Sequence, residues 1–169
     1  FISRLLSEFA EKGLLCRLSK GIYYKPVMTK FGVLMPNVQE LVKAIARRDN
    51  AQVLPTGETA ANLLGLSTQV PMNYVYLTSG SARKIMVGKK TVTFKRCVPK
   101  NFACQNEFLA VLIQAMKAIG QERLTDGHCV VIKGLLMKHL PIESLDADMK
   151  NAPLWVRRMV YNIIKEIGV

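Results

Sequence analysis

The spacing of apolar residues changes once along the chain, and this change constrains the fold more than any other feature. Residues 74 to 97 contain three short β-prone runs, and between residues 91 and 95 apolar and polar side chains alternate, as they do in a strand with one buried face. From Phe108 onward they recur every three or four residues, most regularly between Trp155 and Ile167. Strands followed by helices predict an α+β fold, with a small antiparallel sheet and a helical C-terminal part.

Three short β-prone runs separated by turns make up the expected sheet. They are Tyr74 to Thr78, Lys84 to Val87 and Thr91 to Cys97. In the third run Val92 and Phe94 fall on one face, whereas threonines and a lysine fall on the other. We therefore predict a three-stranded antiparallel meander with one solvated face.

Residues that favour helix ends predict where the other elements begin. Asn37 and Asp126 are suitable caps, and Pro153 suits a first helical turn. The helix that begins at Asp126 is expected to run to His139. Residues 27–36 are expected to form an irregular connector.

The first 30 residues form a pattern of their own. An amphipathic helix with Leu5 and Phe9 on its apolar stripe is followed by Gly13, which ends it. Two β-prone runs then flank the turn at Lys20 and form a hairpin. A helix and a basic hairpin are typical of a recognition helix and wing. We predict that residues 1–30 are the C-terminal part of a winged helix-turn-helix domain, and that residues 31–169 form an α+β domain.

The positive charge is concentrated in the first hundred residues. The net charge is +12, and residues 1–100 contribute +11 of it, from sixteen basic and five acidic residues. Such a surface favours a polyanion, of which nucleic acid is the commonest and an acidic membrane surface the rival. Because the longest apolar run, Phe108 to Ile113, is far too short to cross a bilayer, we expect no membrane partner. With no secretory signal at its start, the chain is expected to be cytoplasmic.

Seven residues are candidate DNA contacts. In the opening helix, an arginine near the start can pair with guanine, and a serine there can touch phosphate. Three cations on the hairpin suit phosphate. Two more follow the Ser79-Gly80-Ser81 turn, whose N–H and hydroxyl groups suggest a phosphate cradle. The seven are Ser3, Arg4, Arg17, Lys20, Lys25, Arg83 and Lys84.

The residues offer little support for catalysis. His128 and His139 are eleven residues apart, about 16 Å along one helix, too far to share a metal ion. The closest acidic group, Glu143, Asp146 and Asp148, is expected on a solvated loop rather than around a nuclease metal ion. We therefore expect a protein that is not an enzyme, with no cofactor and no bound metal.

Several stretches are similar to one family. They are GLLCRLSKGIYYKP (Gly13–Pro26), PTGETAANLLGLSTQVP (Pro55–Pro71) followed by YVYLTSGSARKIMVG (Tyr74–Gly88), and APLWVRRMV (Ala152–Val160). Together they resemble the AbiEi-type antitoxins of type IV toxin–antitoxin (abortive infection) systems and their relatives. The resemblance implies a prokaryotic transcriptional regulator that joins a winged helix to an antitoxin domain. Such a protein represses its own operon by binding inverted repeats in double-stranded DNA and counteracts a nucleotidyltransferase-type toxin. A homodimer is expected if the operator is an inverted repeat.

Two other functions stay open at this point. One is an RNA-binding or nucleic-acid-processing protein, in which the Ser79 to Lys84 turn and the sheet contact the strand. The other is a protein-interaction module whose charge serves only solubility. The apolar helix around Trp155 is a candidate docking surface for a toxin or a second copy. The salt dependence of binding to duplex DNA and to single-stranded RNA distinguishes these functions.

Overall fold

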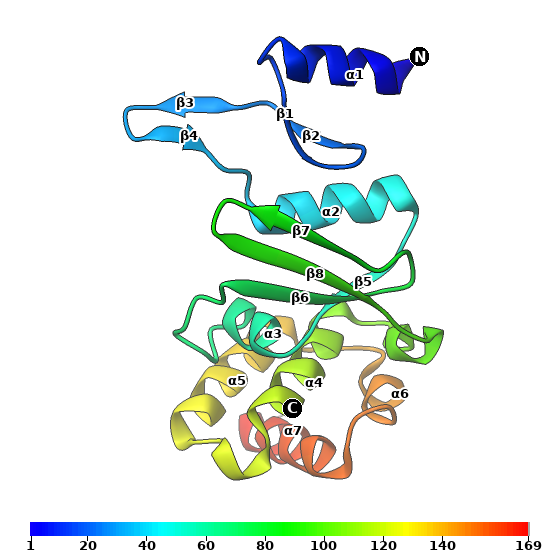
Figure 1. Cartoon of the computed structure of the whole chain (residues 1–169). Coiled ribbons are helices and arrows are strands. Elements are labelled where there is room, and N and C mark those ends of the chain that lie inside the picture. Colours follow the sequence, from blue (N-terminus) through cyan, green and yellow to red (C-terminus); the bar gives the residue numbers. More distant parts are fainter. Residues whose placement is uncertain (169) are drawn as a thin grey trace.

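A four-stranded sheet lies across the middle of the computed structural model, which describes residues 1–168 (Figure 1). In the view of Figure 1, two hairpins and two helices lie above the sheet, and the remaining helices lie below it, next to β5 and β6. The fold is therefore α+β, as the change in apolar spacing indicates. The strands of the sheet are β5 (Val53–Pro55), β6 (Asn73–Thr78), β7 (Arg83–Val87) and β8 (Lys90–Arg96).

The expected antiparallel meander is wrong, because the sheet is mixed and its strand order is β5-β6-β8-β7. Strands β6 and β8 run parallel, in register from Asn73 opposite Thr91 to Thr78 opposite Arg96. Strand β7 pairs only with β8, through a tight turn at Gly88, whose φ of +61° favours glycine. The four residues between β6 and β7 are enough to pass the end of one intervening strand, so β8 inserts between them. Alternation shows which face a residue lies on but not which strand is its neighbour.

One face of the sheet is buried and the other is largely solvated, as expected. The buried side chains include Tyr76, Val92 and Phe94, which pack against helix α2 (Val38–Asp49). On the opposite face, Lys84 is exposed. Burial of one such large apolar side chain stabilises the fold by about 1.5–3 kcal/mol, which attaches α2 firmly to the sheet.

Helix α2 begins where its sequence predicts, after the cap at Asn37, and it ends at Asp49. The Asn37 side chain accepts hydrogen bonds from the backbone N–H groups of Gln39, at 2.8 Å, and Glu40, at 3.4 Å. Arg47 and Arg48 occupy its last turn, where cations favour the helix dipole. The prediction of Asn37 as the cap is confirmed.

Helix α3 and the helices of the C-terminal part of the chain form a helical layer with its own core. Its members are α3 (Glu58–Leu63), α4 (Glu107–Ile119), α5 (Asp126–His139), α6 (Leu145–Met149) and α7 (Leu154–Ile167), with short 3-10 turns at Pro99–Phe102 and Gln121–Arg123. Leu112, Leu136 and Val160 are completely buried where α4, α5 and α7 meet. The expected bounds of α5 are correct, but its cap is Thr125, whose hydroxyl accepts the N–H of His128 at 3.4 Å.

The solvated loop expected around the acidic group is correct for Glu143, which lies in an exposed turn, and is wrong for Asp148. Asp148 lies in α6 and is 1% exposed. Its carboxylate accepts hydrogen bonds from the N–H groups of Gln105, at 2.7 Å, and Asn106, at 2.9 Å, and from the Ser144 hydroxyl, at 2.7 Å. These donors compensate the cost of burying the charge and fix the start of α4.

The N-terminal part contains the expected helix and hairpin, and a second hairpin that was not expected. Helix α1 (Ile2–Glu11) precedes β1 (Cys16–Ser19) and β2 (Ile22–Tyr24), which pair antiparallel. Residues 27–36 are not an irregular connector, because β3 (Val27–Thr29) and β4 (Gly32–Leu34) pair in the same way. Gly32, with φ of +111°, permits the turn between them. The domain boundary expected after residue 30 falls in this turn.

Within residues 1–168, none of the helices combines the length and the apolar character that a bilayer span needs.

Candidate nucleic-acid interface

The two hairpins belong to a stretch of the chain that contains no acidic residue. From Lys12 to Gln39 there is no aspartate or glutamate. The same stretch carries five cations, all exposed: Lys12, Arg17, Lys20, Lys25 and Lys30. In three dimensions this stretch lies at the end of the molecule farthest from helix α7 (Figure 1). We call it the cationic end, with α1 included.

The β1–β2 hairpin lies between α1 and α2 and contacts both. Ile22 is buried in the core formed by α2 and the sheet. The hydroxyl groups of Tyr23 and Ser7 are 3.3 Å apart and hydrogen-bonded, which joins the hairpin to α1. At the tip, Arg48 Nη1 donates a hydrogen bond of 2.9 Å to the carbonyl of Gly21. The hairpin is therefore beside the opening helix, as expected, but its tip is supported rather than free.

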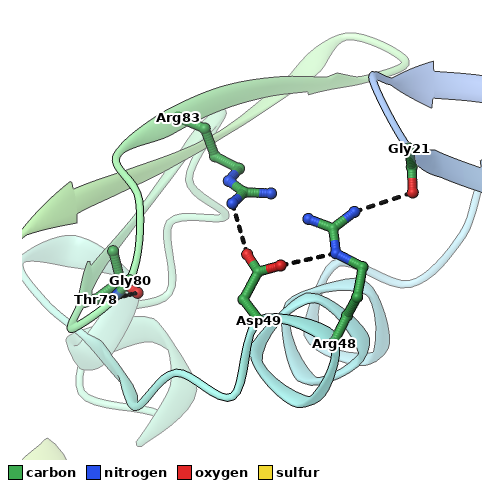
Figure 2. Close-up of polar contacts among 6 residues, drawn as sticks. All are labelled: Gly21, Arg48, Asp49, Thr78, Gly80 and Arg83. Atoms are coloured by element: carbon green, nitrogen blue, oxygen red, sulfur yellow. Dashed lines mark hydrogen bonds and ion pairs between the residues drawn. The ribbon is translucent and has the colours of Figure 1, made fainter.

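A three-residue ion cluster supports this tip (Figure 2). The Asp49 carboxylate pairs with Arg48 Nε at 2.8 Å and with Arg83 Nη2 at 2.5 Å. The hydrogen bond from Arg48 lowers the pKa of Asp49 below its ordinary value, and the charge of Arg83 adds to this effect. The cluster links the end of α2 to strand β7 and, through Arg48, to the hairpin.

The predicted contacts in α1 are exposed. Arg4 lies on the outer side of the helix, where its Nε is 3.3 Å from Glu8 Oε1. This pair is open to solvent, so Arg4 exchanges it for a phosphate or a base at little cost. Ser3 is exposed one residue earlier, and its carbonyl accepts a hydrogen bond from the Ser7 hydroxyl. Helix α1 buries none of its residues.

The three predicted contacts of the hairpin lie close together. Arg17 is in β1, with its guanidinium 5.9 Å from the centre of the Tyr23 ring. This cation–π contact restrains an arginine whose side chain otherwise extends into solvent. Lys20 is in the turn, and Lys25 directly follows β2. The structure thus gathers Arg17, Lys20 and Lys25 on one small element.

Arg83 and Lys84 are not brought together, although they are adjacent in sequence. Successive strand residues point to opposite faces. Arg83 points toward α2 and binds Asp49, whereas Lys84 is exposed on the solvated face. Arg83 and Lys84 therefore lie in different environments, one in an ion pair and the other in solvent.

The turn before Arg83 uses several of its polar groups internally. The Gly80 N–H donates to the Thr78 hydroxyl at 3.0 Å (Figure 2). The Ser79 N–H donates to the carbonyl of Gln52 at 3.1 Å, and the Ser79 hydroxyl accepts from the Gln52 N–H at 2.9 Å. These groups brace β5 against the end of β6. Only the remaining part of the turn, Ser81 and Ala82, is available to an anion.

Sequence analysis missed two groups of residues at the cationic end. Arg48 was not among the predicted contacts, but it holds the hairpin tip through its hydrogen bond to Gly21. Lys30 and Phe31 fall in the expected connector, but they form the exposed turn of the β3–β4 hairpin. Two three-residue runs around a glycine turn were the available signal for that hairpin.

The solvated sheet face lacks a stacking surface for bases. In the strands at residues 73–96, the aromatic side chains are Tyr74, Tyr76 and Phe94, and all three are buried on the α2 side. Single-stranded nucleic acids are usually bound by stacking bases on exposed aromatic rings. This face therefore provides cations and hydroxyls, but not the rings that the RNA alternative requires.

The two histidines have structural contacts. His128 Nδ1 accepts the N–H of Thr125 at 3.0 Å, and its Nε2 lies 3.1 Å from the carbonyl of Leu66. His139 stacks on Phe108 with ring centres 4.0 Å apart. Among residues 1–168, no three His, Cys, Asp or Glu side chains come close enough to hold a metal ion.

These features define an α+β protein with a cationic end and a helical end, residues 101–169, that is almost neutral. A family model matches residues 1–144, so the chain belongs to DUF6088, which is described as a family of unknown function. No curated protein and no solved structure gives a significant match.

Proposed function

We propose that the protein binds double-stranded DNA through its cationic end and acts as a transcriptional regulator of antitoxin type. In this proposal α1 is the recognition helix and the β1–β2 hairpin is the wing of a winged-helix unit. Arg4 and Ser3 face the major groove, while Arg17, Lys20 and Lys25 contact phosphates. The protein represses its own operon, and its helical end engages a partner toxin.

The separation of charge along the molecule is the observation that carries the proposal. Residues 1–100 hold a net charge of +11 and residues 101–169 hold +1. Only three of the sixteen basic residues in the first part, Arg4, Arg48 and Arg83, form ion pairs within the described chain. A surface with this excess attracts a polyanion and fixes its register through phosphate contacts.

Two features favour duplex DNA over single-stranded RNA. A helix with an adjacent hairpin matches the groove and backbone of a duplex, because the helix fits the major groove. The solvated sheet face, in contrast, has no exposed aromatic ring on its strands. The cytoplasmic location and the absence of catalysis remain parts of this proposal.

The helical end offers a groove for the partner protein. A groove of about 850 Å³ lies between α5 and α7, lined by Trp155, Met159 and Val130 among others. Val130 is 70% exposed at its edge, and Lys133 pairs with Glu166 across the two helices at 3.4 Å. Apolar walls with charged edges suit an amphipathic helix of another protein. We propose that the partner toxin binds in this groove.

Fluorescence anisotropy with labelled nucleic acids tests the DNA part of the proposal. The ligands are a 25-bp duplex from the region upstream of the gene and a single-stranded RNA of about the same length. We expect tighter binding to the duplex. The double variant Arg17→Glu/Lys20→Glu should bind the duplex at least about tenfold more weakly, because two phosphate contacts become repulsive.

The matched control is Lys138→Glu/Lys150→Glu, which makes the same change of charge at exposed positions of the helical end. It should retain most of the affinity. Equal losses in the two double variants would show that only net charge matters. Equal or tighter binding of the RNA would reject the duplex as the ligand.

A further inference from the structure

The β3–β4 hairpin is an apolar arm that extends away from the sheet and the helices (Figure 1). All six of its strand residues are exposed. Phe31, in the turn, is 100% exposed, and Met28 is 74% exposed. Scattered apolar residues are ordinary on a protein surface, but a gathered set of this kind usually marks a binding site.

The turn that carries Phe31 is held by specific hydrogen bonds. The Thr29 hydroxyl donates to the Gly32 carbonyl at 2.8 Å and accepts the N–H of Phe31 at 3.2 Å. At the base of the arm, the Tyr24 hydroxyl lies 3.6 Å from the sulfur of Met35. Phe31 is therefore presented from an ordered turn, so little conformational entropy is lost when it binds.

The charge around the arm identifies the kind of partner. Lys25 precedes the arm and Lys30 is next to Phe31, and the acid-free stretch continues to Gln39. An apolar side chain between cations is complementary to nucleic acid, which offers apolar base faces between phosphates. A second copy of this chain would bring the same cations against them and be repelled.

We propose that the β3–β4 hairpin is a second DNA-binding arm, with Phe31 as a wedge between adjacent base pairs. The two-stranded ribbon lies in the minor groove, while Lys25 and Lys30 contact the phosphates on either side. A wedge of this kind partly unstacks one step and bends the duplex. The inference rests on the proposed function, because β1–β2 and β3–β4 are separated by only Lys25 and Pro26.

A bending assay tests the wedge. A 30-bp duplex with donor and acceptor dyes at its ends and a flexible TA step at its centre is titrated with the full chain. Wild-type protein should raise the transfer efficiency. The variant Phe31→Ala should leave the duplex unbent, whereas Phe31→Leu should retain most of the bend because it keeps an apolar wedge. Circular dichroism checks that both variants fold.

The salt dependence of DNA binding distinguishes the contribution of Phe31 from that of the cations. Phe31→Ala should weaken binding without changing the slope of log K against log salt, because no phosphate contact is lost. Lys30→Ala should make the slope shallower by about 0.9. If Phe31→Ala bends the duplex as the wild type does, the inference is overturned.

Other outcomes are equally decisive. Salt-dependent binding without any bend rejects the arm and leaves the proposed function standing, whereas no binding to duplex rejects both. The alternative of a lipid surface is tested with vesicles of phosphatidylserine and phosphatidylcholine. Partition of the wild type onto these vesicles, lost in Phe31→Ala and accompanied by no bending of DNA, would assign the arm to membranes. Loss of a dimer in Phe31→Ala, measured by sedimentation, would assign it to self-association.

Discussion

The cationic end and the helical end of this molecule use their apolar residues in opposite ways. In the helical end, Leu109, Leu112 and Leu136 are completely buried. At the cationic end, α1 buries none of its residues and Phe31 is fully exposed. The comparison shows that the helical end contributes a buried core, whereas α1 and the β3–β4 hairpin are organised mainly as surface.

The largest effect should come from removing a side chain of the helical core. Leu136→Ala creates a cavity where α5 meets its neighbours, so we expect a loss of about 2–5 kcal/mol in the free energy of unfolding. Urea denaturation followed by circular dichroism measures it. Phe31→Ala at the cationic end should change this free energy by less than about 0.5 kcal/mol. Similar losses in the two variants would contradict the comparison.

Removing the buried charge should have the next largest effect. Asp148→Asn replaces one accepting oxygen with a donor that faces the N–H groups of Gln105 and Asn106. We expect a loss of about 1–3 kcal/mol, since buried donors lose their acceptor. Thermal unfolding measures it, with Glu143→Gln at an exposed site as the control. An unchanged midpoint would show that Asp148 does not hold the start of α4.

The support of the hairpin tip gives a smaller and more local effect. Arg48→Ala removes the hydrogen bond to Gly21 and one of the two ion pairs of Asp49. Amide hydrogen exchange should become faster in β1 and β2, while amides in α4 and α7 keep their protection. Faster exchange in α4 as well would mean that the two ends unfold as one unit.

The smallest effect is the pH dependence of the Asp49 cluster. The hydrogen bond from Arg48, with the charge of Arg83, lowers the pKa of Asp49 below its ordinary value of 3.8. A carboxyl group with a lowered pKa stabilises the folded state fully above its unfolded pKa, and this contribution disappears as pH falls through the folded value. Wild type should therefore exceed Asp49→Asn in stability at pH 7, and the difference should shrink as the pH falls below 3.8, the ordinary pKa of the carboxyl group. A difference that is constant with pH would exclude the carboxylate as its source.

Several features of the helices were predictable from the sequence, because helical periodicity and capping are local. The bounds of α5 and the cap at Asn37 follow from residues a few positions apart. The strand order of the sheet did not follow, since the pairing of β6 with β8 is a contact between segments about 18 residues apart that alternation cannot specify. The burial of Asp148 was not predicted either. Its acidic neighbours in the sequence favour an exposed segment, and only the fold brings the N–H group of Gln105 to its carboxylate.

The candidate interface was predictable in part for the same reason. Arg17, Lys20 and Lys25 belong to one hairpin, so their proximity follows from a local turn. The link from Asp49 to Arg83 spans 34 residues and leaves no local pattern. Sequence therefore identifies the cations, whereas the structure shows which of them are engaged.

The salt dependence of duplex binding tests the central claim most directly. If Arg17, Lys20 and Lys25 each neutralise a phosphate, log K should fall with log salt at a slope of about −2.7 or steeper. Arg17→Ala/Lys20→Ala should reduce the steepness by about 1.8, and Lys138→Ala/Lys150→Ala should leave it unchanged. A slope near zero, or the same reduction in both double variants, would contradict the assignment of the DNA-binding surface to the cationic end.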